Sequence, residues 1–265
     1  MRRGPAHRAL ASPLVADPSV WQIVLLAVVG FLAGAVNAVA GGGSLIAFPV
    51  LLGVGLPPLA ANVTNSVAQF PGYAGSTFSA RRQLPPQRRR LAGTGIAAVL
   101  GAALGCGLLL VLPESVFDAV VPVLVLLASL TLGARPLLAR LTGVTERDRP
   151  VALTVSIFFA AVYGGYFGGA LGVVLIAVLG LLAADDLRAL NAVKVALSLL
   201  VSTVTVVLFA IFAPVDWFAV ALLAPSTLLG GYLGMIVAKR MPEPVLRWSV
   251  VVLGVGVAAY LFLDG

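Results

Sequence analysis

The sequence contains little of what a soluble protein needs at its surface. Only 10% of the 265 residues are charged and 60% are apolar, whereas a soluble domain carries about a quarter of its residues as Asp, Glu, Lys or Arg. The mean hydropathy of +1.09 points the same way. A chain with so little charge cannot cover its own surface in water. This excludes a soluble enzyme, a disordered tail and a secreted disulfide scaffold, and it predicts one integral membrane domain.

Cysteine and histidine are nearly missing, which excludes several kinds of site. The only cysteine, Cys106, lies in an apolar run, so we expect a small core residue rather than part of a disulfide or metal site. The only histidine, His7, lies in the polar N-terminal segment, which removes a histidine proton relay, a haem ligand pair and an HExxH zinc site. The apolar segments hold no paired carboxylates, so an intramembrane enzyme would lack its nucleophile–base pair or metal. We predict a protein that is not an enzyme and has no metal or cofactor.

The net charge of +7 would suggest nucleic acid on a soluble protein, but the positions of the cations favour another explanation. Most of the 17 Lys and Arg residues form four clusters beside apolar segments, and such loops mark the cytoplasmic side of membrane proteins. The clusters are Arg2, Arg3 and Arg8; Arg81, Arg82, Arg88, Arg89 and Arg90; Arg135, Arg140, Arg147 and Arg149; and Lys239, Arg240 and Arg247. We expect the lipid bilayer, and no nucleic acid, as a partner.

Charge, proline and glycine divide the sequence into eight spans and two shorter apolar segments, given that a span takes about 20 residues. The spans are 21–40, 60–80, 91–112, 116–134, 151–167, 187–212, 217–238 and 245–263; the shorter segments are 44–55 and 170–183. The predicted fold is an all-α polytopic membrane protein with about eight transmembrane helices in two repeats of four. Its parts are a basic N-terminal segment (1–20), a first repeat (21–134), a basic cytoplasmic loop (135–150) and a second repeat (151–265).

The two halves share one pattern. In each, a span runs into a glycine cluster, a short apolar segment follows, and the next span opens with polar residues. Duplicated bundles with helices broken at matching positions are typical of transporters. The clusters are Gly41, Gly42 and Gly43 before Ser44 in the first half, and Gly164, Gly165, Gly168 and Gly169 in the second.

Orientation follows from the basic loops only in part. With the N-terminus inside and segment 44–55 re-entrant, all loop arginines of the first half lie inside, as the positive-inside rule requires. The same topology places Lys239 and Arg240 outside, unless segment 170–183 crosses the membrane and returns them inside. The sequence leaves both arrangements of the second half open.

Lys194 is the one charge well inside an apolar segment. A buried cation is costly unless it has a partner or a water-filled cavity, so two interpretations stand. The lysine extends to the interface, or it faces a central site. Its counterpart in the first half, Asn65, is also polar. Asn62 and Asn65, like Asn191 and Lys194, are three residues apart and share a helical face.

The polar residues and the glycines each have two readings. Asn62, Thr64 and Asn65 either bind a ligand or hold helices together. Three consecutive glycines at Gly41–Gly43 break a helix just before another begins, and the new helix presents free N–H groups and a positive dipole end. In a membrane this geometry suits an anion, and Gly168 and Gly169 can act likewise. A purely structural role, close helix packing, is expected for Gly101, Gly105, Gly230 and Gly234. Asp216, just before Trp217, is expected to cap a helix.

Together these residues resemble the TauE/SafE family of sulfite exporters. The resemblance covers nearly the whole chain, from about Trp21 to Leu263, and rests on the order and spacing of several motifs. They are Gly34-Ala35-Val36-Asn37-Ala38-Val39-Ala40-Gly41-Gly42-Gly43-Ser44, Pro49, Ala61-Asn62-Val63-Thr64-Asn65, Phe78–Leu84, Gly164–Gly169 and Leu190-Asn191-Ala192-Val193-Lys194. The resemblance implies a bacterial inner-membrane permease of duplicated four-helix units for sulfite, sulfonates or related organosulfur anions. One departure is that Gly168-Gly169-Ala170 stands where the first half has three glycines.

The resulting hypothesis is a secondary transporter for a small anion, sulfite or an organosulfonate, working by alternating access. No segment resembles the GxxxxGK[ST] phosphate loop, so ATP is not the direct energy source. The candidate substrate-binding residues are Gly41, Gly42, Gly43, Ser44, Asn62, Thr64, Asn65, Gly168, Gly169, Asn191 and Lys194. A membrane assembly or scaffold protein without transport is the main alternative, and a channel and a homo-oligomer are left open.

Overall fold

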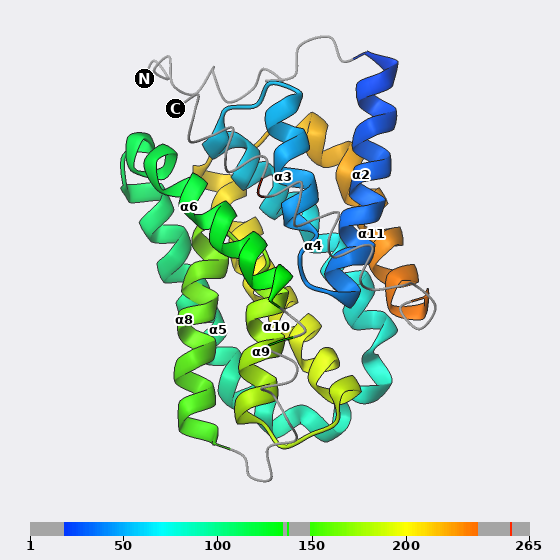
Figure 1. The fold of residues 1–265 in the computed structure, drawn as a ribbon, viewed down its shortest axis with the longest axis vertical. Coiled ribbons are helices and arrows are strands. Elements are labelled where there is room, and N and C mark those ends of the chain that lie inside the picture. The colour runs from blue at the N-terminus through cyan, green and yellow to red at the C-terminus, as the bar shows by residue number, and fades with distance from the viewer. Residues whose placement is uncertain (1–18, 135–136, 138–148, 238–254, 256–265) are drawn as a thin grey trace, which may run out of the picture.

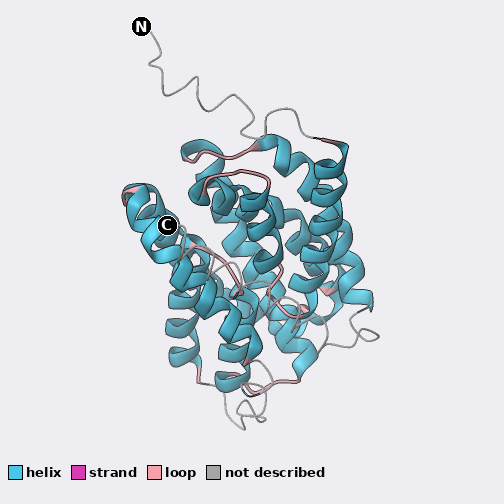
Figure 2. Ribbon diagram, turned by 45° about the horizontal axis from the view of Figure 1, so that its top comes forward, coloured by secondary structure: helices cyan, strands magenta, loops and turns pink. Residues whose placement is uncertain are grey.

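The protein is helical throughout the residues that the computed structural model describes, which are 19–134 and 149–237 together with residues 137 and 255 (Figures 1 and 2). The first half contains α2 (Val20–Val39), α3 (Ser44–Gly53), α4 (Pro58–Ser79), the short 3-10 helices η1 (Arg81–Gln83) and η2 (Pro85–Gln87), α5 (Arg88–Val111) and α6 (Glu114–Gly133). The second contains α8 (Pro150–Tyr166), α9 (Leu171–Leu182), α10 (Leu187–Phe212) and α11 (Trp217–Val237).

Local sequence signals explain where several helices begin. Ser19 and Gln22 form a capping box at the start of α2, which satisfies N–H groups that have no partner within the helix. Asp186 caps α10 by accepting from the N–H of Ala189 at 2.7 Å. Asp216 accepts from the N–H of Ala219 at 2.8 Å, so the predicted cap of α11 is confirmed.

Five of the described helices, α2, α5, α6, α10 and α11, are long and apolar enough to cross a membrane. The all-α prediction is confirmed, and α3 and α9 are short apolar helices where the sequence predicts them. α4 and α8 are not among the five: α8 has only 17 residues, and α4 carries several buried polar side chains. The eighth predicted span, 245–263, falls outside the described residues, so the count of eight spans in two repeats stays a prediction.

The halves pack against each other through glycine contacts. A Cβ atom at Gly101 would lie 2.3 Å from the carbonyl oxygen of Phe158, and one at Gly230 would lie 2.0 Å from that of Phe31. The backbones of α5 and α8, and of α2 and α11, therefore approach more closely than any side chain permits. Gly105 and Gly234 make the same kind of contact, and the packing role predicted for all four glycines is confirmed. Cys106 is fully buried in the same core.

The contact pairs also fix the helix directions. α11 runs parallel to α2, because Gly30 lies against Leu223 and Gly34 against Thr227. It runs parallel to α4 as well, where Gly72 lies against Thr227 and Gly75 against Leu228. α2 and α4 consequently point the same way.

The helices α5, α8 and α10 point in the opposite direction. α5 and α10 begin side by side, where Gln87 and Arg90 bond Asp185, and Gly95 lies near Leu200 farther along, so they are parallel. α8 is parallel to α5, since Gly101 meets Phe158 and Gly105 meets Val162. α10 is antiparallel to α4, because Thr77 lies near the start of α10, at Val195, and Thr64 lies beyond its end, at Asp216. The first helix of the second half thus runs opposite to the first helix of the first half.

These directions correct one expectation. A re-entrant segment 44–55 after a complete crossing by α2 would make α2 and α4 antiparallel, with the start of α2 on the same face as Arg81–Arg90. They are parallel, so α2 begins on the face opposite those arginines. The reason is the glycine break, at which the chain turns back so that α3 returns toward the face from which α2 came (Figure 1).

Candidate functional site

The two short helices begin at the same place in the molecule. α3 occupies the upper half of the view in Figure 1 and α9 the lower half, and Gly41, just before α3, touches Gly172 in the first turn of α9. A Cβ on Gly41 would lie 2.4 Å from the carbonyl carbon of Gly172, and one on Gly172 would lie 2.5 Å from the Cα of Gly41. Gly41 also has a φ of +86°, which favours glycine. The N-terminal ends of two half-helices, one from each half of the chain, therefore face one another.

Asn37 organises the first break. Its Oδ1 accepts from the N–H of Gly43 at 2.7 Å and its Nδ2 donates to Oε1 of Gln69 at 3.0 Å. Gln69 in turn donates from Nε2 to Oδ1 of Asn65 at 3.2 Å. This buried chain fixes the start of α3 against α4. Asn37 and Gln69 were not predicted as site residues, although an amide inside an otherwise apolar segment is a signal that could have found them.

The second break is built differently. Gly168 has a φ of +77° and Ala170 a φ of +55°, a conformation that costs an ordinary residue about 1–2 kcal/mol. Two aromatic residues hold this turn: the hydroxyl of Tyr163 donates to the carbonyl of Gly169, and the ring of Phe167 packs where a Cβ on Gly169 would lie. Phe167 also meets Phe48 of α3 edge to face, with centroids 5.5 Å apart, which links the two breaks.

Lys194 lies beside the first break. Its side chain is 1% exposed, and its Nζ donates to the carbonyl oxygens of Asn37 and Ala38 at 3.2 and 3.1 Å. These carbonyls lie at the C-terminal end of α2, where a helix carries partial negative charge. The interpretation in which the lysine extends to the membrane interface is therefore wrong. The amino group of Lys194 lies in the interior, hydrogen-bonded to the residue that positions Gly43 and Gln69.

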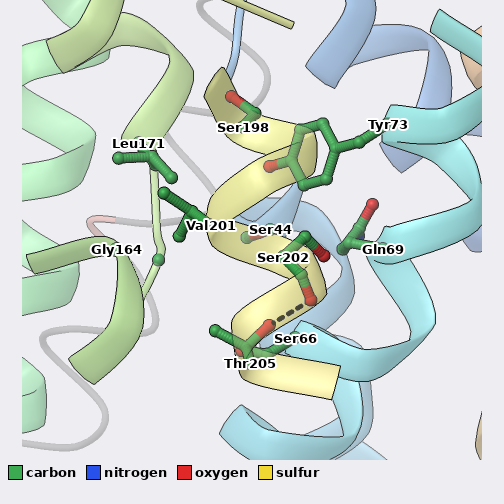
Figure 3. Close-up of a pocket in the computed structure, with 11 residues that line it drawn as sticks. Ser44, Ser66, Gln69, Tyr73, Gly164, Leu171, Ser198, Val201, Ser202 and Thr205 are labelled. Atoms are coloured by element: carbon green, nitrogen blue, oxygen red, sulfur yellow. Dashed lines mark hydrogen bonds between the residues drawn. The ribbon is translucent and has the colours of Figure 1, made fainter. Parts of the chain in front are cut away.

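A small cavity lies where α3, α4, α8, α9 and α10 meet (Figure 3). The space inside it is about 20 Å³, which is room for one water molecule. Figure 3 shows Gln69 and Tyr73 of α4 and Ser198, Ser202 and Thr205 of α10 around it. Its complete lining is Ser44, Ser66, Gln69, Tyr73, Gly164, Gly168, Leu171, Ser198, Val201, Ser202 and Thr205.

The structure brings some predicted residues to this cavity and places others beside it. Ser44 and Gly168 line it directly. Asn62, Thr64 and Asn191 instead hold helices together. Asn62 donates to the carbonyl of Tyr166 at 3.1 Å, Thr64 Oγ1 accepts from the N–H of Asp216 at 2.9 Å, and Asn191 donates to the carbonyl of Ala38 at 3.5 Å. Gly41, Gly42, Gly43, Asn65, Gly169 and Lys194 lie in the turns and in the hydrogen-bonded chain around these helix starts.

Sequence reasoning missed the hydroxyl groups of the cavity. Ser198, Ser202 and Thr205 recur at four- and three-residue spacing on one face of α10, and this polar stripe was a readable signal. The hydroxyls of Ser198 and Ser202, like Oδ1 of Asn62, are buried without a hydrogen-bond partner among the described residues. Buried polar atoms are usually satisfied, so the two serine hydroxyls, which line the cavity, point to something that it binds.

The cavity is suited to negative charge. Among the described residues no Asp or Glu lines it, whereas hydroxyl and amide groups do, and the buried amino group of Lys194 is only one residue away through Asn37. Half-helix N-termini add the positive ends of two dipoles. Broken helices whose starts meet beside a cavity that carries hydroxyl and amide groups, inside an apolar bundle, define a class of protein, the helical membrane transporters.

Comparison with known proteins identifies the group within that class. The sequence pattern of the family described as sulfite exporter TauE/SafE matches residues 26–261, and the chain belongs to this family. It is 26% identical to a "Probable membrane transporter protein" of Haemophilus influenzae, over 94% of this chain and 97% of that protein. It is 27% identical to "Probable membrane transporter protein ORF9" of Sinorhizobium sp., over 91% and 93% of the two chains.

A third relative is "Probable membrane transporter protein YfcA" of Escherichia coli, 25% identical over 89% of this chain and 88% of that protein. No solved structure matches the chain. With its apolar helices, the protein is a multi-pass membrane protein of a transporter family.

Proposed function

We propose that this protein is a secondary transporter for a small anion, sulfite or an organosulfonate. The observation that carries the proposal is the cavity between the facing starts of α3 and α9, which is lined by hydroxyl and amide groups and by no carboxylate. Two family features support it: the TauE/SafE membership and the relatives' names as membrane transporters.

The proposed mechanism assigns each group a task in binding. At the starts of α3 and α9 most of the first N–H groups already donate to carbonyls of the preceding turns, so these helix ends act on the anion through the positive ends of their dipoles. Ser198 and Ser202 of α10 supply hydroxyl donors that have no partner in the described part of the chain. Lys194 is held near the cavity by its hydrogen bond to the carbonyl of Asn37. In the proposed mechanism its positive charge attracts the anion, and the low dielectric of the interior strengthens this attraction.

The cavity is too small for the proposed substrate as it stands. A space of about 20 Å³ holds one water and no sulfite, so the proposed transport requires the helices around the site to move apart. α2 and α8 belong to opposite halves and run in opposite directions, so one half can open the site to one side of the membrane and the other half to the other side. Such inverted halves support alternating access.

The arginines of the described residues orient the protein. Arg81, Arg82, Arg88, Arg89, Arg90, Arg149 and Arg188 lie at or beside the ends of α4, α5, α8 and α10 that share one face. By the positive-inside rule, we propose that this face is the cytoplasmic one. α11 also ends on this face, because it runs parallel to α4; Lys239 and Arg240 lie outside the described residues, and their cytoplasmic arrangement stays a prediction.

Flux in proteoliposomes tests the proposal. We expect saturable uptake of labelled sulfite, competition by thiosulfate, taurine or sulfate that ranks the substrates, and at least a tenfold loss of flux in a Ser198→Ala, Ser202→Ala double variant. Thr203→Val is the matched control, because Thr203 is exposed on the same helix and its hydroxyl bonds only the carbonyl of Leu199. Normal flux in the double variant would remove these hydroxyls from the site. No flux of any tested anion would favour the scaffold alternative.

A further inference from the structure

A second polar pocket lies at the arginine-rich face, away from the central cavity. It has a volume of about 460 Å³ and is formed by the start of α5, the start of α8 and the loop before α10. Arg89 and Arg90 contribute two positive charges to it, and Gln87, Thr94 and Thr154 contribute polar side chains. The transport mechanism proposed above uses none of these residues.

Asp185 is the one carboxylate among the described residues that line this pocket, and it is already paired. Oδ2 of Asp185 accepts hydrogen bonds from Gln87 and from Nη1 of Arg90, the latter at 3.0 Å. Partial burial opposes ionisation, but the hydrogen bonds from Gln87 and Arg90 outweigh it and hold the pKa of Asp185 below its ordinary value. The carboxylate therefore neutralises Arg90 at neutral pH. The charge of Arg89 is not balanced by this carboxylate, so the described lining of the pocket has a net positive charge.

An apolar groove continues from the pocket along the outer face of the bundle. It lies between α5 and α8 and has a volume of about 400 Å³. It shares Gly93 and Thr154 with the polar pocket. Ile96 and Leu100 on its α5 side are 67% and 58% exposed, and Val155 on its α8 side is 51% exposed. From Gly93 to Leu100 the groove is about 10 Å long and runs away from the arginine-rich face.

We propose that the pocket and the groove together bind one anionic phospholipid. Its phosphate lies against Arg89 and Arg90, and one acyl chain lies along Ile96, Leu100 and Phe158. Three observations select this occupant. The charge of the pocket is complementary to a phosphate, the adjoining groove accepts only an apolar group, and the arginine-rich face places the junction between them where headgroups meet acyl chains. A soluble phosphate would leave the groove empty, and a second copy of this chain would not need the arginine pocket.

Gly93 offers a substitution that tests the groove without disturbing the core. Nothing lies within 4 Å of a Cβ built on Gly93, and the same holds for Gly107 farther along α5. Gly93→Leu places a side chain where the pocket joins the groove, whereas Gly107→Leu adds the same side chain outside them. Arg89→Gln removes the charge from the pocket, and Arg82→Gln removes an exposed arginine on the same face that does not line it.

Native mass spectrometry of the delipidated full-length protein measures the binding. The probes are phosphatidylglycerol and phosphatidylcholine with identical acyl chains, and inorganic phosphate. We expect one phosphatidylglycerol bound at least tenfold more tightly than phosphatidylcholine. Arg89→Gln should weaken it about fivefold, as expected for one cation at an anionic surface, and Gly93→Leu should weaken it to a similar extent. Both control variants should bind as the wild type does.

Several results would overturn the proposal. Equal binding of the two lipids would remove the headgroup site, and full competition by millimolar phosphate would make it a soluble-anion site. Unchanged phosphatidylglycerol binding in Gly93→Leu would remove the groove. A mass of two chains without lipid would instead assign the groove to a second copy. As a control, the variants and the wild type should unfold at the same temperature, which shows that a variant that loses lipid binding is still folded.

Discussion

Replacing Lys194 by methionine tests how the break in α2 is held together. The carbonyls of Asn37 and Ala38 belong to the last turn of α2, which ends at Val39, and such carbonyls have no partner within the helix. Lys194 satisfies both of them, at 3.2 and 3.1 Å. Methionine nearly preserves the length and volume of the lysine side chain but has no donor. The variant therefore removes two hydrogen bonds while it leaves the packing nearly unchanged.

The expected cost follows from these contacts. A hydrogen bond from a charged donor contributes about 1.5–3 kcal/mol, so the two bonds contribute about 3–6 kcal/mol. Two effects reduce the loss. Methionine does not pay for burying a charge, and Asn191 retains a long hydrogen bond of 3.5 Å to the carbonyl of Ala38. We expect a net destabilisation of about 2–4 kcal/mol.

Thermal unfolding in detergent measures this loss. For a chain of this size the loss corresponds to a fall in Tm of about 5–15 °C. Lys194→Arg keeps donors near both carbonyls and should recover more than half of the loss. Thr203→Met, at an exposed position of the same helix, should unfold like the wild type. A Lys194→Met protein that melts within 1–2 °C of the wild type would refute the reasoning, because the two carbonyls would then be satisfied without the lysine.

Two further substitutions probe the central contact and the arginine-rich face. Gly41→Ala forces a positive φ and a clash with the backbone of Gly172, so it should cost about 2–4 kcal/mol in chemical unfolding. The control Gly53→Ala lies in α3, and its Cβ meets nothing within 4 Å; it should leave stability unchanged or raise it by up to about 1 kcal/mol. A Gly41→Ala protein as stable as the Gly53→Ala control would contradict the contact. Because the pKa of Asp185 is lowered, its pair with Arg90 stabilises the fold above the ordinary Asp pKa of about 3.9 and is lost as the pH falls through the lowered value. Asp185→Asn should therefore reduce stability by about 0.5–1 kcal/mol at pH 7 and match the wild type in strong acid; a gap that persists in acid would disprove the link to ionisation.

The helices themselves could be predicted from the sequence. The predicted span 187–212 coincides with α10, and the predicted short segment 170–183 brackets α9. These boundaries are local, since a stretch of apolar residues ends where proline, glycine or charge makes burial or helix continuation costly. The cap at Asp216 and the close-packing glycines on α5 and α11 follow from equally local rules.

The candidate site was predictable only in outline. The glycine clusters indicated two broken helices, and Ser44 and Gly168 do line the cavity. The partners of the polar residues were not readable, because they lie far away in the chain. Lys194 bonds a carbonyl 157 residues away and Asn62 bonds one 104 residues away. Whether a buried amide binds a ligand or another helix depends on which group the fold brings within 3 Å of it.

By itself, the sequence determined the class of protein, the positions of its helices and the places where two of them break. Each of these follows from the hydropathy and backbone preferences of neighbouring residues. The tertiary structure alone decided the direction of α3, the meeting of Gly41 with Gly172 and the choice of α10 hydroxyls for the cavity. These features arise from packing between the two halves, where close backbone approach and the need to satisfy buried polar groups select one arrangement among many that the same local patterns permit.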